Sequence, residues 1–422
     1  MIDEPLNYLL SLNAQEFVRM FWHTLFIEIP RYLLPGALIA LGHASHRPRR
    51  TVAGGPTAPR VSVLLPGHNE SARLELAVQS MRLQSRPPDQ IIVIDDGSTD
   101  GMGALARRLK REGAIDLALS TRLRGGKSAA ANLGLGYATG EVVVIADVDT
   151  TYDDDAFERL VAPFDDPACG AVSGNLGVRN WNEGLIARWQ TIQYLLSISL
   201  GRRVTDMLGI LYIVSGAFGA FRRTALEQVG GWDVGPGEDA DITVKLRQAG
   251  WRVQFAPEAW ALTDAPETLT ALVRQRLRWN RSLVRIRLRK FGRILNPRRD
   301  AFLLRNAMGV LDVLFFQVVL AASFLSYLIW LFWTYGSFAW IAVAAVSMFY
   351  VGLGTIGFLA ACAVSGDYGR LRLLPEAMTY GLFNSYFLRF VRLYAALDEL
   401  IYRHSYDDDY VPQKVRERTE VY

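Results

Sequence analysis

Three short β-rich apolar runs in this chain each end in polar or acidic residues, and this pattern limits the folds that the chain can adopt. The runs are VSVLLP (61–66), IIVIDD (91–96) and EVVVIADVD (141–149), and helical periodicity over 70–84 separates the first two. Strands that alternate with helices predict parallel βαβ units. Ligands of such sheets bind at the carboxyl ends of the strands. We therefore expect an α/β domain over residues 61–265 with its site at those ends.

Apolar segments flank this domain on both sides. Residues 21–42 are long enough to span a bilayer, although Glu28 and Arg31 interrupt them. Because these two residues are three positions apart, they lie on one helix face and can form an ion pair. That face would pack against protein or line a polymer path. Two further spans are expected near 309–334 and 338–364, and half of all residues are hydrophobic, which suits a soluble domain joined to membrane spans.

Basic residues accompany the apolar segments. Arginines cluster at 47–50, 285–299 and 370–372, which is typical of sequence next to membrane spans. Residues 266–296 are basic and amphipathic and predict helices at the membrane interface. Segment 374–402 is apolar but carries charged residues, so a span, a broken span and an interface helix all stay open. A net charge of only +4, without a recognisable nucleic-acid-binding module, argues against a nucleic-acid partner.

These patterns divide the chain into five parts, which differ in hydropathy and charge. They are an N-terminal segment with a transmembrane helix (1–45), an α/β domain (46–265), amphipathic interface helices (266–305), two to three transmembrane helices (306–402) and a polar tail (403–422).

Carboxylates follow two of the predicted strands. Asp147-x-Asp149 ends the third apolar run, and two carboxylates at a strand end can hold Mg²⁺ or Mn²⁺ together with diphosphate oxygens. A metal held there can neutralise a departing nucleoside diphosphate. Asp95-Asp96 ends the second run. These carboxylates can accept hydrogen bonds from a uracil N–H or a ribose hydroxyl, or they can cap a helix beginning near Thr99.

Two loops add further polar groups to the same edge of the predicted sheet. Residues 66–70 (PGHNE) close the first strand and can form a wall of a nucleotide pocket that includes Glu70. Residues 125–128 (GGKS) offer backbone amides and the Lys127 cation to a phosphate. This loop is too short for a P-loop, which needs a longer glycine spacing.

Glu238-Asp239 precedes a run with helical periodicity. An acid at the start of a helix can serve only to stabilise the helix dipole. In a functional interpretation, Asp239 is a general base that takes a proton from an acceptor hydroxyl as the hydroxyl attacks an anomeric carbon.

Gln275-x-x-Arg278-Trp279 places a planar cation beside a large aromatic ring. Arg278 can bind a diphosphate bidentately, and Trp279 can give a sugar ring an apolar platform. The alternative is an interface helix with Arg and Trp at the level of the lipid headgroups, and this alternative explains Arg276 well.

In this order, the four motifs Asp95-Asp96, Asp147-x-Asp149, Glu238-Asp239 and Gln275-x-x-Arg278-Trp279 resemble those of family-2 processive glycosyltransferases. These proteins are membrane-embedded synthases of poly-N-acetylglucosamine, chitin oligosaccharide, hyaluronan and cellulose. The resemblance covers residues 60–285 by motif. It implies a GT-A domain, a Rossmann-like mixed sheet on the cytoplasmic side, inserted between an N-terminal transmembrane helix and C-terminal interface and transmembrane helices.

The resemblance also implies the reaction. A UDP-sugar, with UDP-N-acetylglucosamine favoured over UDP-glucose, would extend a β-linked polysaccharide with inversion, and the enzyme would use Mg²⁺ or Mn²⁺. The implied setting is the bacterial inner membrane, with several spans, membrane lipid as a partner, and export or regulatory subunits as further partners.

Individual residues take roles from the same resemblance, each by its position in a motif. Asp239 would be the catalytic base, Asp147 and Asp149 would hold the metal, Glu70, Asp95, Asp96, Lys127 and Asp147 would contact the nucleotide, and Ser215, Gly216, Phe218, Glu238, Gln275, Arg278 and Trp279 would contact the acceptor and diphosphate.

Two departures and two alternatives remain. His68 stands where many relatives have a tyrosine, and Asn-Arg-Ser follows Trp279 where many have a nearby glycine, so sugar identity stays open. One alternative is a non-processive enzyme that adds one sugar to a lipid or short acceptor. The other is a catalytically silent membrane scaffold, which would predict loss of Asp239 or of the paired aspartates.

Overall fold

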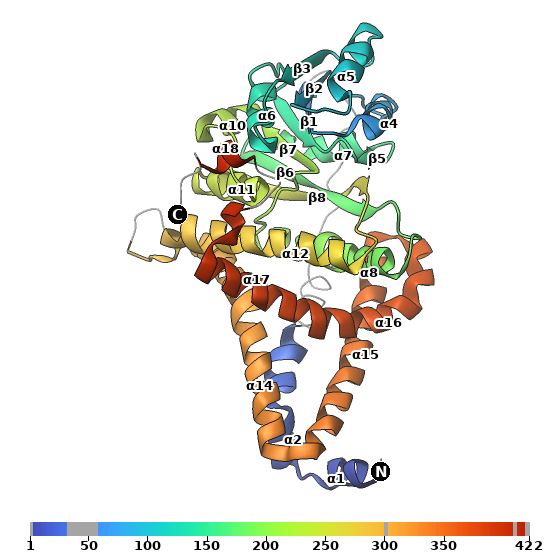
Figure 1. Ribbon diagram of the computed structural model, residues 1–422, viewed down its shortest axis with the longest axis vertical. Helices are drawn as coiled ribbons and strands as arrows, with labels where there is room; N and C mark the ends of the chain where they lie inside the picture. Colours follow the sequence, from blue (N-terminus) through green and yellow to red (C-terminus); the bar gives the residue numbers. More distant parts are fainter. Residues whose placement is uncertain (1–2, 32–57, 299–302, 408–411, 418–422) are drawn as a thin grey trace.

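A mixed eight-stranded sheet lies at the centre of the upper part of the molecule (Figure 1). The structure is a computed structural model that describes residues 3–31, 58–298, 303–407 and 412–417. The strand order is β3-β2-β1-β4-β7-β6-β8-β5. The strands are β1 (Val61–Gly67), β2 (Gln90–Asp96), β3 (Leu117–Thr121), β4 (Val142–Ala146), β5 (Thr151–Tyr152), β6 (Cys169–Val178), β7 (Phe218–Arg222) and β8 (Arg252–Thr263). The predicted α/β sheet is therefore confirmed.

The first four strands form the parallel part of the sheet, as their apolar runs predict. β1 pairs in parallel with β2 and β4, and β2 pairs in parallel with β3. β7 runs antiparallel to both β4 and β6. The runs can be continuously apolar because β1, β2 and β4 are buried along almost their whole length, as expected for strands covered on both faces.

Helices cover both faces of the sheet and give it two apolar layers. One layer packs α4, α5 and α7 against the sheet, and the other packs α6, α10 and α11 against the opposite face. These helices are α4 (Ser71–Arg82), α5 (Met102–Arg111), α6 (Lys127–Leu135), α7 (Ala156–Val161), α10 (Arg223–Val229) and α11 (Glu238–Gln248). The parallel strands β1, β2 and β4 therefore end at one common edge, near Gly67, Asp96 and Ala146.

Helices that run across the molecule form a floor beneath the sheet domain (Figure 1). They are α8 (Leu185–Tyr194) with its continuation η3 (Leu195–Leu200) and α9 (Gly201–Met207), α12 (Leu269–Val284) with η4 (Arg285–Lys290), α16 (Leu374–Leu382), η9 (Phe383–Leu388) and α17 (Arg389–Tyr402). Segment 374–402 lies across the base in Figure 1 and does not run parallel to the stalk below. This arrangement favours the interface-helix alternative for that segment.

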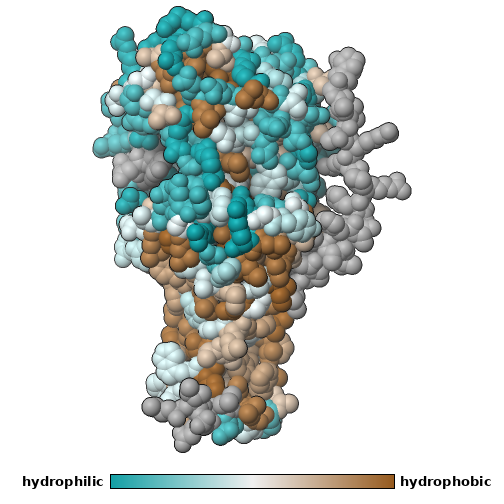
Figure 2. All heavy atoms as spheres, turned by 90° about the vertical axis from the view of Figure 1, so that its right-hand side faces the viewer, coloured by the Kyte–Doolittle hydropathy of each residue, from teal (hydrophilic) through white to brown (hydrophobic). Residues whose placement is uncertain are grey.

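A helical stalk extends from this floor away from the sheet (Figure 1). Its hairpin consists of α14 (Leu320–Tyr335) and α15 (Ala339–Ser365), and α13 (Leu304–Val313) leads into it through η6 (Leu314–Val319). Within the described ranges, one helical stretch, Leu320–Ser365, is long and apolar enough to cross a membrane by length and composition. Figure 2 shows a stalk surface dominated by hydrophobic residues beneath a largely hydrophilic upper domain. The predicted arrangement of separate spans stays a prediction.

The N-terminal helices α1 (Asp3–Ser11) and α2 (Ala14–His23) belong to the stalk, and η1 (Thr24–Glu28) continues α2. Glu28 is fully buried, 3.5 Å from Arg31 and 2.8 Å from Arg389. The polar face of this segment therefore packs against protein. The remainder of the expected 21–42 span and the arginine cluster at 47–50 lie outside the described residues.

Candidate active site

A cavity of about 1030 Å³ lies at the carboxyl edge of the parallel strands, between the sheet and α12. Twelve of the residues singled out in the sequence line it, and they come from both the sheet domain and the floor. They are Glu70, Asp96, Lys127, Asp147, Asp149, Ser215, Gly216, Glu238, Asp239, Gln275, Arg278 and Trp279.

Asp95 and Phe218 lie outside the set of residues that line this cavity. Phe218 is fully buried in the apolar layer of the sheet. The Asp95 carboxylate accepts hydrogen bonds from the Ser98 amide at 3.0 Å and from the Ser120 hydroxyl at 2.6 Å. The structure therefore gives Asp95 a role in shaping the turn after β2. Neither acid caps α5, because that helix begins at Met102, whose amide donates to Asp100.

Asp96 faces the cavity and also holds the glycine loop. Its two carboxylate oxygens accept the backbone N–H groups of Gly125 and Gly126, each at 2.7 Å. Gly126 has φ = 83°, a conformation that favours glycine. Because α6 begins at the next residue, Lys127, the Asp96 carboxylate fixes the point from which the lysine side chain enters the cavity.

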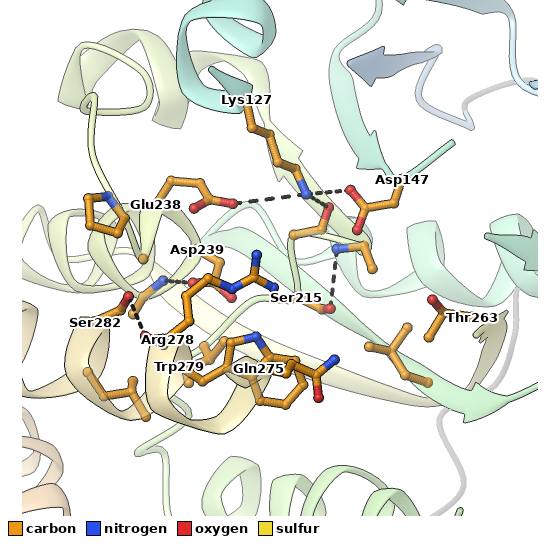
Figure 3. Close-up of a pocket in the computed structure, with 18 of the residues that line it drawn as sticks. Lys127, Asp147, Ser215, Glu238, Asp239, Thr263, Gln275, Arg278, Trp279 and Ser282 are labelled. Carbon is orange, nitrogen blue, oxygen red and sulfur yellow. Dashed lines mark hydrogen bonds and ion pairs between the residues drawn. The ribbon is translucent and has the colours of Figure 1, made fainter. Parts of the chain in front are cut away.

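The Lys127 side chain lies between the carboxylates of Asp147 and Glu238 (Figure 3). Its ammonium group forms an ion pair with Asp147, donates to the Gly216 carbonyl at 3.0 Å and lies 4.0 Å from Glu238 Oε1. Burial alone would lower the pKa of this ammonium, but the charges of Asp147 and Glu238 outweigh burial and raise it to about 12. The lysine is therefore a fixed positive charge in the centre of an acidic cavity.

Asp147 and Asp149 follow β4 directly, as the sequence predicts. Burial and the neighbouring Asp147 charge raise the pKa of Asp149, and burial together with the Asp149 charge raises the pKa of Glu70. Excess negative charge on oxygen donors suits Mg²⁺ or Mn²⁺. No group of three or more His, Cys, Asp or Glu side chains with metal-site geometry occurs in the described part of the chain. A cation held by this pair would therefore need further oxygen ligands, such as diphosphate oxygens.

Glu238 and Asp239 open α11, with Gly237 in a left-handed conformation just before them. One oxygen of Asp239 accepts the Ala240 amide at 2.7 Å, so the acid also satisfies a free N–H at the helix end. Burial and the Asp239 charge raise the pKa of Glu238 to about 7. Burial raises the pKa of Asp239 as well, against the lowering influence of that amide and of Lys127.

Gln275, Arg278 and Trp279 reach the cavity from α12 on the opposite side (Figure 3). Positions 275, 278 and 279 follow the i, i+3, i+4 spacing that places side chains on one helix face. Figure 3 shows Arg278 extending from α12 towards Asp239, with the Trp279 ring beneath it. The interpretation of Arg276 as a residue at the lipid headgroups is wrong, because its side chain is buried against α8 and donates to Gln190.

One wall of the cavity carries no recognisable signal in the sequence. Helix α8 and its continuations η3 and α9 contribute Gln193, Tyr194, Ser197, Arg202 and Thr205 to the lining. The stretch contains no acidic pair or glycine loop that would mark it as part of a site. Helical periodicity alone predicts only which face is turned to the protein.

Comparisons with known proteins agree with this geometry. Residues 62–230 match the family described as Glycosyl transferase family 2. Poly-beta-1,6-N-acetyl-D-glucosamine synthase of Staphylococcus aureus (strain COL) is 30% identical over 262 residues, which cover 62% of this chain and 63% of that protein. The enzyme of the same name from Staphylococcus epidermidis is 31% identical over 241 residues, covering 57% and 58% of the two chains. The chain thus spans less than two thirds of the length of these relatives.

One solved structure shares the fold over most of the chain. It is the mannosyltransferase PcManGT from Pyrobaculum calidifontis in complex with GDP-Man and Mn²⁺, which matches with a TM-score of 0.59 and 23% identity. The match covers 91% of this chain and 96% of that chain. The likeness therefore extends beyond the sheet domain to the helices below it.

Proposed function

We propose that residues 62–230, which match the family described as Glycosyl transferase family 2, are a domain of that family and that the protein polymerises a β-linked polysaccharide from a UDP-sugar. UDP-N-acetylglucosamine is the favoured donor because the relatives at 30% and 31% identity are named poly-beta-1,6-N-acetyl-D-glucosamine synthases. UDP-glucose is the next candidate.

The observation that carries this proposal is that one cavity contains both halves of a transfer site. Acids from two strand ends and Lys127 line one side, while Asp239 and the three residues of α12 line the other. A volume of about 1030 Å³ lies at the upper end of the range that is usual for small-molecule sites. Such a space suits a nucleotide sugar together with the end of an acceptor.

On the donor side, residues at the strand ends and on α12 would bind and orient the nucleoside diphosphate. Asp96 and Glu70 would contact the nucleoside, and Lys127 and Arg278 would stabilise the charge of the departing diphosphate. Asp147 and Asp149 would hold Mg²⁺ or Mn²⁺, which supplies additional neutralisation of that charge when bound. The solved mannosyltransferase relative was determined with GDP-Man and Mn²⁺, which supports a divalent cation here.

On the acceptor side, Asp239 would act as the general base. It would take the proton of the acceptor hydroxyl while that oxygen forms a bond to the anomeric carbon and the bond from this carbon to the diphosphate oxygen breaks. Attack from the face opposite the leaving group inverts the configuration. Trp279 would support the terminal sugar ring, and Ser215 and Gln275 would bind its hydroxyls.

We further propose that the stalk anchors the enzyme in the bacterial inner membrane as a multi-pass protein, with the sheet domain in the cytoplasm. Large apolar side chains are exposed along the hairpin, including Ile329, Trp333, Trp340, Met348 and Ile356, and an apolar surface of this kind is typical of contact with lipid. Arginines 370 and 372 lie in the loop at the domain end of α15, as the positive-inside rule expects for a cytoplasmic loop.

Purified protein in nanodiscs, incubated with Mn²⁺ and single UDP-sugars, tests the proposal. UDP release and product mass are measured together, with Asp239→Asn as the control that should bind UDP without transferring sugar. We expect a ladder of products from UDP-N-acetylglucosamine alone. A single-addition product would support the non-processive alternative. An absence of UDP release from every donor would contradict a transferase altogether and favour the silent scaffold.

A further inference from the structure

One arginine of α12, Arg276, lines the acceptor side of the cavity although most of its side chain is buried. Arg276 is 9% exposed, whereas Arg274 on the same helix is exposed to solvent. Burial of a charged group is costly unless polar contacts replace water, and burial also lowers the pKa of this guanidinium. The buried Arg276 guanidinium therefore needs polar or aromatic partners within the protein, which an arginine at the lipid headgroups would not need.

Two contacts hold the Arg276 guanidinium in place. It donates a hydrogen bond to the Gln190 side-chain oxygen on α8, and its Cζ atom lies 4.3 Å from the centre of the Trp279 ring. Because residues three apart are neighbours on a helix surface, the planar cation can stack on the indole from within the same helix. A stacked cation limits the orientations open to the ring.

The hydrogen bonds continue from Arg276 to the opposite wall. Gln190 is fully buried, and its amide nitrogen donates to the Gln193 side-chain oxygen at 3.2 Å. Gln193 and Trp279 both line the cavity, one from α8 and one from α12. One continuous chain of side-chain contacts therefore joins two walls of the acceptor side. It runs from Gln193 through Gln190 and Arg276 to Trp279.

We infer that Arg276 is a positioning residue that holds the Trp279 ring and the Gln193 amide in the orientation that receives the acceptor sugar. This inference rests on the proposed function. A sugar ring stacks well only on an aromatic face that is turned towards it, so a ring free to rotate would bind the acceptor less often in the reactive pose.

This arrangement separates acceptor binding from donor chemistry. The donor side is built from the loops after β1, β2 and β4 and from Lys127, whereas Arg276 contacts Gln190 of α8 and the Trp279 ring of α12. Loss of Arg276 should therefore affect transfer to an acceptor while leaving nucleotide binding and hydrolysis of the donor by water nearly unchanged. A general loss of folding would reduce all of these together.

The test uses the full chain in nanodiscs with UDP-N-acetylglucosamine and a soluble N-acetylglucosamine oligosaccharide as acceptor. Arg276→Met is compared with Arg274→Met, an exposed arginine on the same helix. For Arg276→Met we expect kcat/KM for the acceptor to fall about tenfold, the scale of a desolvated cation–π contact. UDP binding and UDP release without acceptor should stay within about twofold of wild type, since only acceptor contacts change.

Three further substitutions show whether Arg276 acts through its partners. Arg276→Lys keeps the charge but lacks the planar group that stacks, so it should also lose acceptor efficiency. In a double-mutant cycle with Trp279→Leu, the loss of acceptor efficiency in the double variant should be smaller than the sum of the losses in the two single variants. The reason is that both changes remove the same platform. Gln190→Leu removes the hydrogen bond from Arg276 to α8, and it gives the same test if Arg276→Met does not fold.

Three results would overturn the inference. The first is an acceptor kcat/KM for Arg276→Met equal to that of Arg274→Met. The second is an equal loss of UDP release with and without acceptor, which would mark Arg276 as purely structural. The third is no UDP release from the wild-type protein, which would overturn the proposed function itself and the role of Arg276 with it.

Discussion

Burial and neighbouring charges together shift the pKa values of the charged residues in the cavity. Lys127 keeps a raised pKa of about 12 because Asp147 and Glu238 surround it, and Glu238 reaches a pKa of about 7 because burial and Asp239 act together. Lys127 in turn lowers the pKa of both Glu238 and Asp239. Glu238 therefore titrates near neutral pH beside the proposed general base Asp239, whose pKa burial also raises.

Lys127→Met should move the acid limb of the pH profile. A base must be deprotonated to accept a proton, so the wild-type kcat/KM should fall as pH falls through the raised pKa values of the Glu238–Asp239 pair, in which the pKa of Glu238 is about 7. Without the lysine charge, the pKa values of Glu238 and Asp239 rise further, and the limb shifts to higher pH. The profile of kcat/KM reports groups of the free enzyme, and for this coupled pair it reports the pair as a unit.

The exposed lysine of α5, Lys110, supplies the matched control for that measurement. Lys110→Met changes the net charge equally but lies outside the cavity, so its limb should coincide with that of wild type. A Lys127→Met limb at the wild-type pH, whatever the change in absolute rate, would contradict the proposed coupling.

Metal binding should depend on Asp149. We expect EDTA to stop UDP release and Mg²⁺ or Mn²⁺ to restore it, because a bound cation neutralises the excess negative charge of the two carboxylates. Asp149→Asn should weaken Mn²⁺ binding measured directly by electron paramagnetic resonance, whereas Asp154→Asn, an exposed acid close by, should not. Full activity in EDTA would remove the metal assignment of Asp147 and Asp149.

At the scale of elements, the sequence predicts the sheet well because its signal is local. The runs at 61–66 and 91–96 are β-branched and apolar enough to identify β1 and β2 almost to the residue. The adjacent acids Asp95 and Asp96 show the limit of such reasoning. Successive side chains of a strand point to opposite sides, so both could not face one cavity, and composition does not say which one does.

Long-range contacts decide the elements that the sequence leaves open. Segment 374–402 is ambiguous because Asp398 and Glu399 interrupt an apolar run. In the structure these acids bind arginines of the α12 region, with Arg281 2.6 Å from Asp398 and Arg289 3.1 Å from Glu399. A charge pattern within α17 cannot reveal partners that lie more than a hundred residues earlier in the chain.

Removal of Arg289 should loosen α17 from the floor of the site. Glu399 is fully buried, so Arg289→Met removes its paired charge and leaves the carboxylate with its hydrogen bonds from Ser405, which should cost up to about 3–5 kcal/mol. Thermal unfolding in detergent should show a large drop for Arg289→Met and almost none for Arg293→Met, an exposed arginine nearby. Equal melting temperatures for the two variants would show that the pair does not hold these helices together.

At the scale of the whole molecule, the stalk connects to the site through buried polar contacts. Arg389, at the start of α17, pairs with Glu28 of the N-terminal helices, and the Tyr327 hydroxyl of α14 donates to the Met20 carbonyl at 2.8 Å. Helix α17 then packs along α12, which carries Trp279. The N-terminus, the hairpin and the active-site floor are therefore one connected assembly, although they are far apart in the sequence.

The Glu28–Arg389 pair tests this connection. Both side chains are almost completely buried, so Arg389→Met should destabilise the protein by about 3–5 kcal/mol, because it leaves the buried Glu28 charge without its closest partner. Arg31→Met removes the more exposed and more distant partner of Glu28, at 3.5 Å, and should cost less than about 1 kcal/mol. Thermal unfolding of the variants in nanodiscs measures both effects.

A double variant distinguishes a lost ion pair from a lost packing contact. Glu28→Gln combined with Arg389→Met removes the charge that lost its closest partner, so it should recover a large part of the stability lost in Arg389→Met, because the main penalty of a broken buried pair is the charge left behind. UDP release at a temperature where the variants stay folded should follow stability in the same order. If Arg389→Met melts at the wild-type temperature, the pair does not join the N-terminal helices to α17, and the stalk and floor would need another connection.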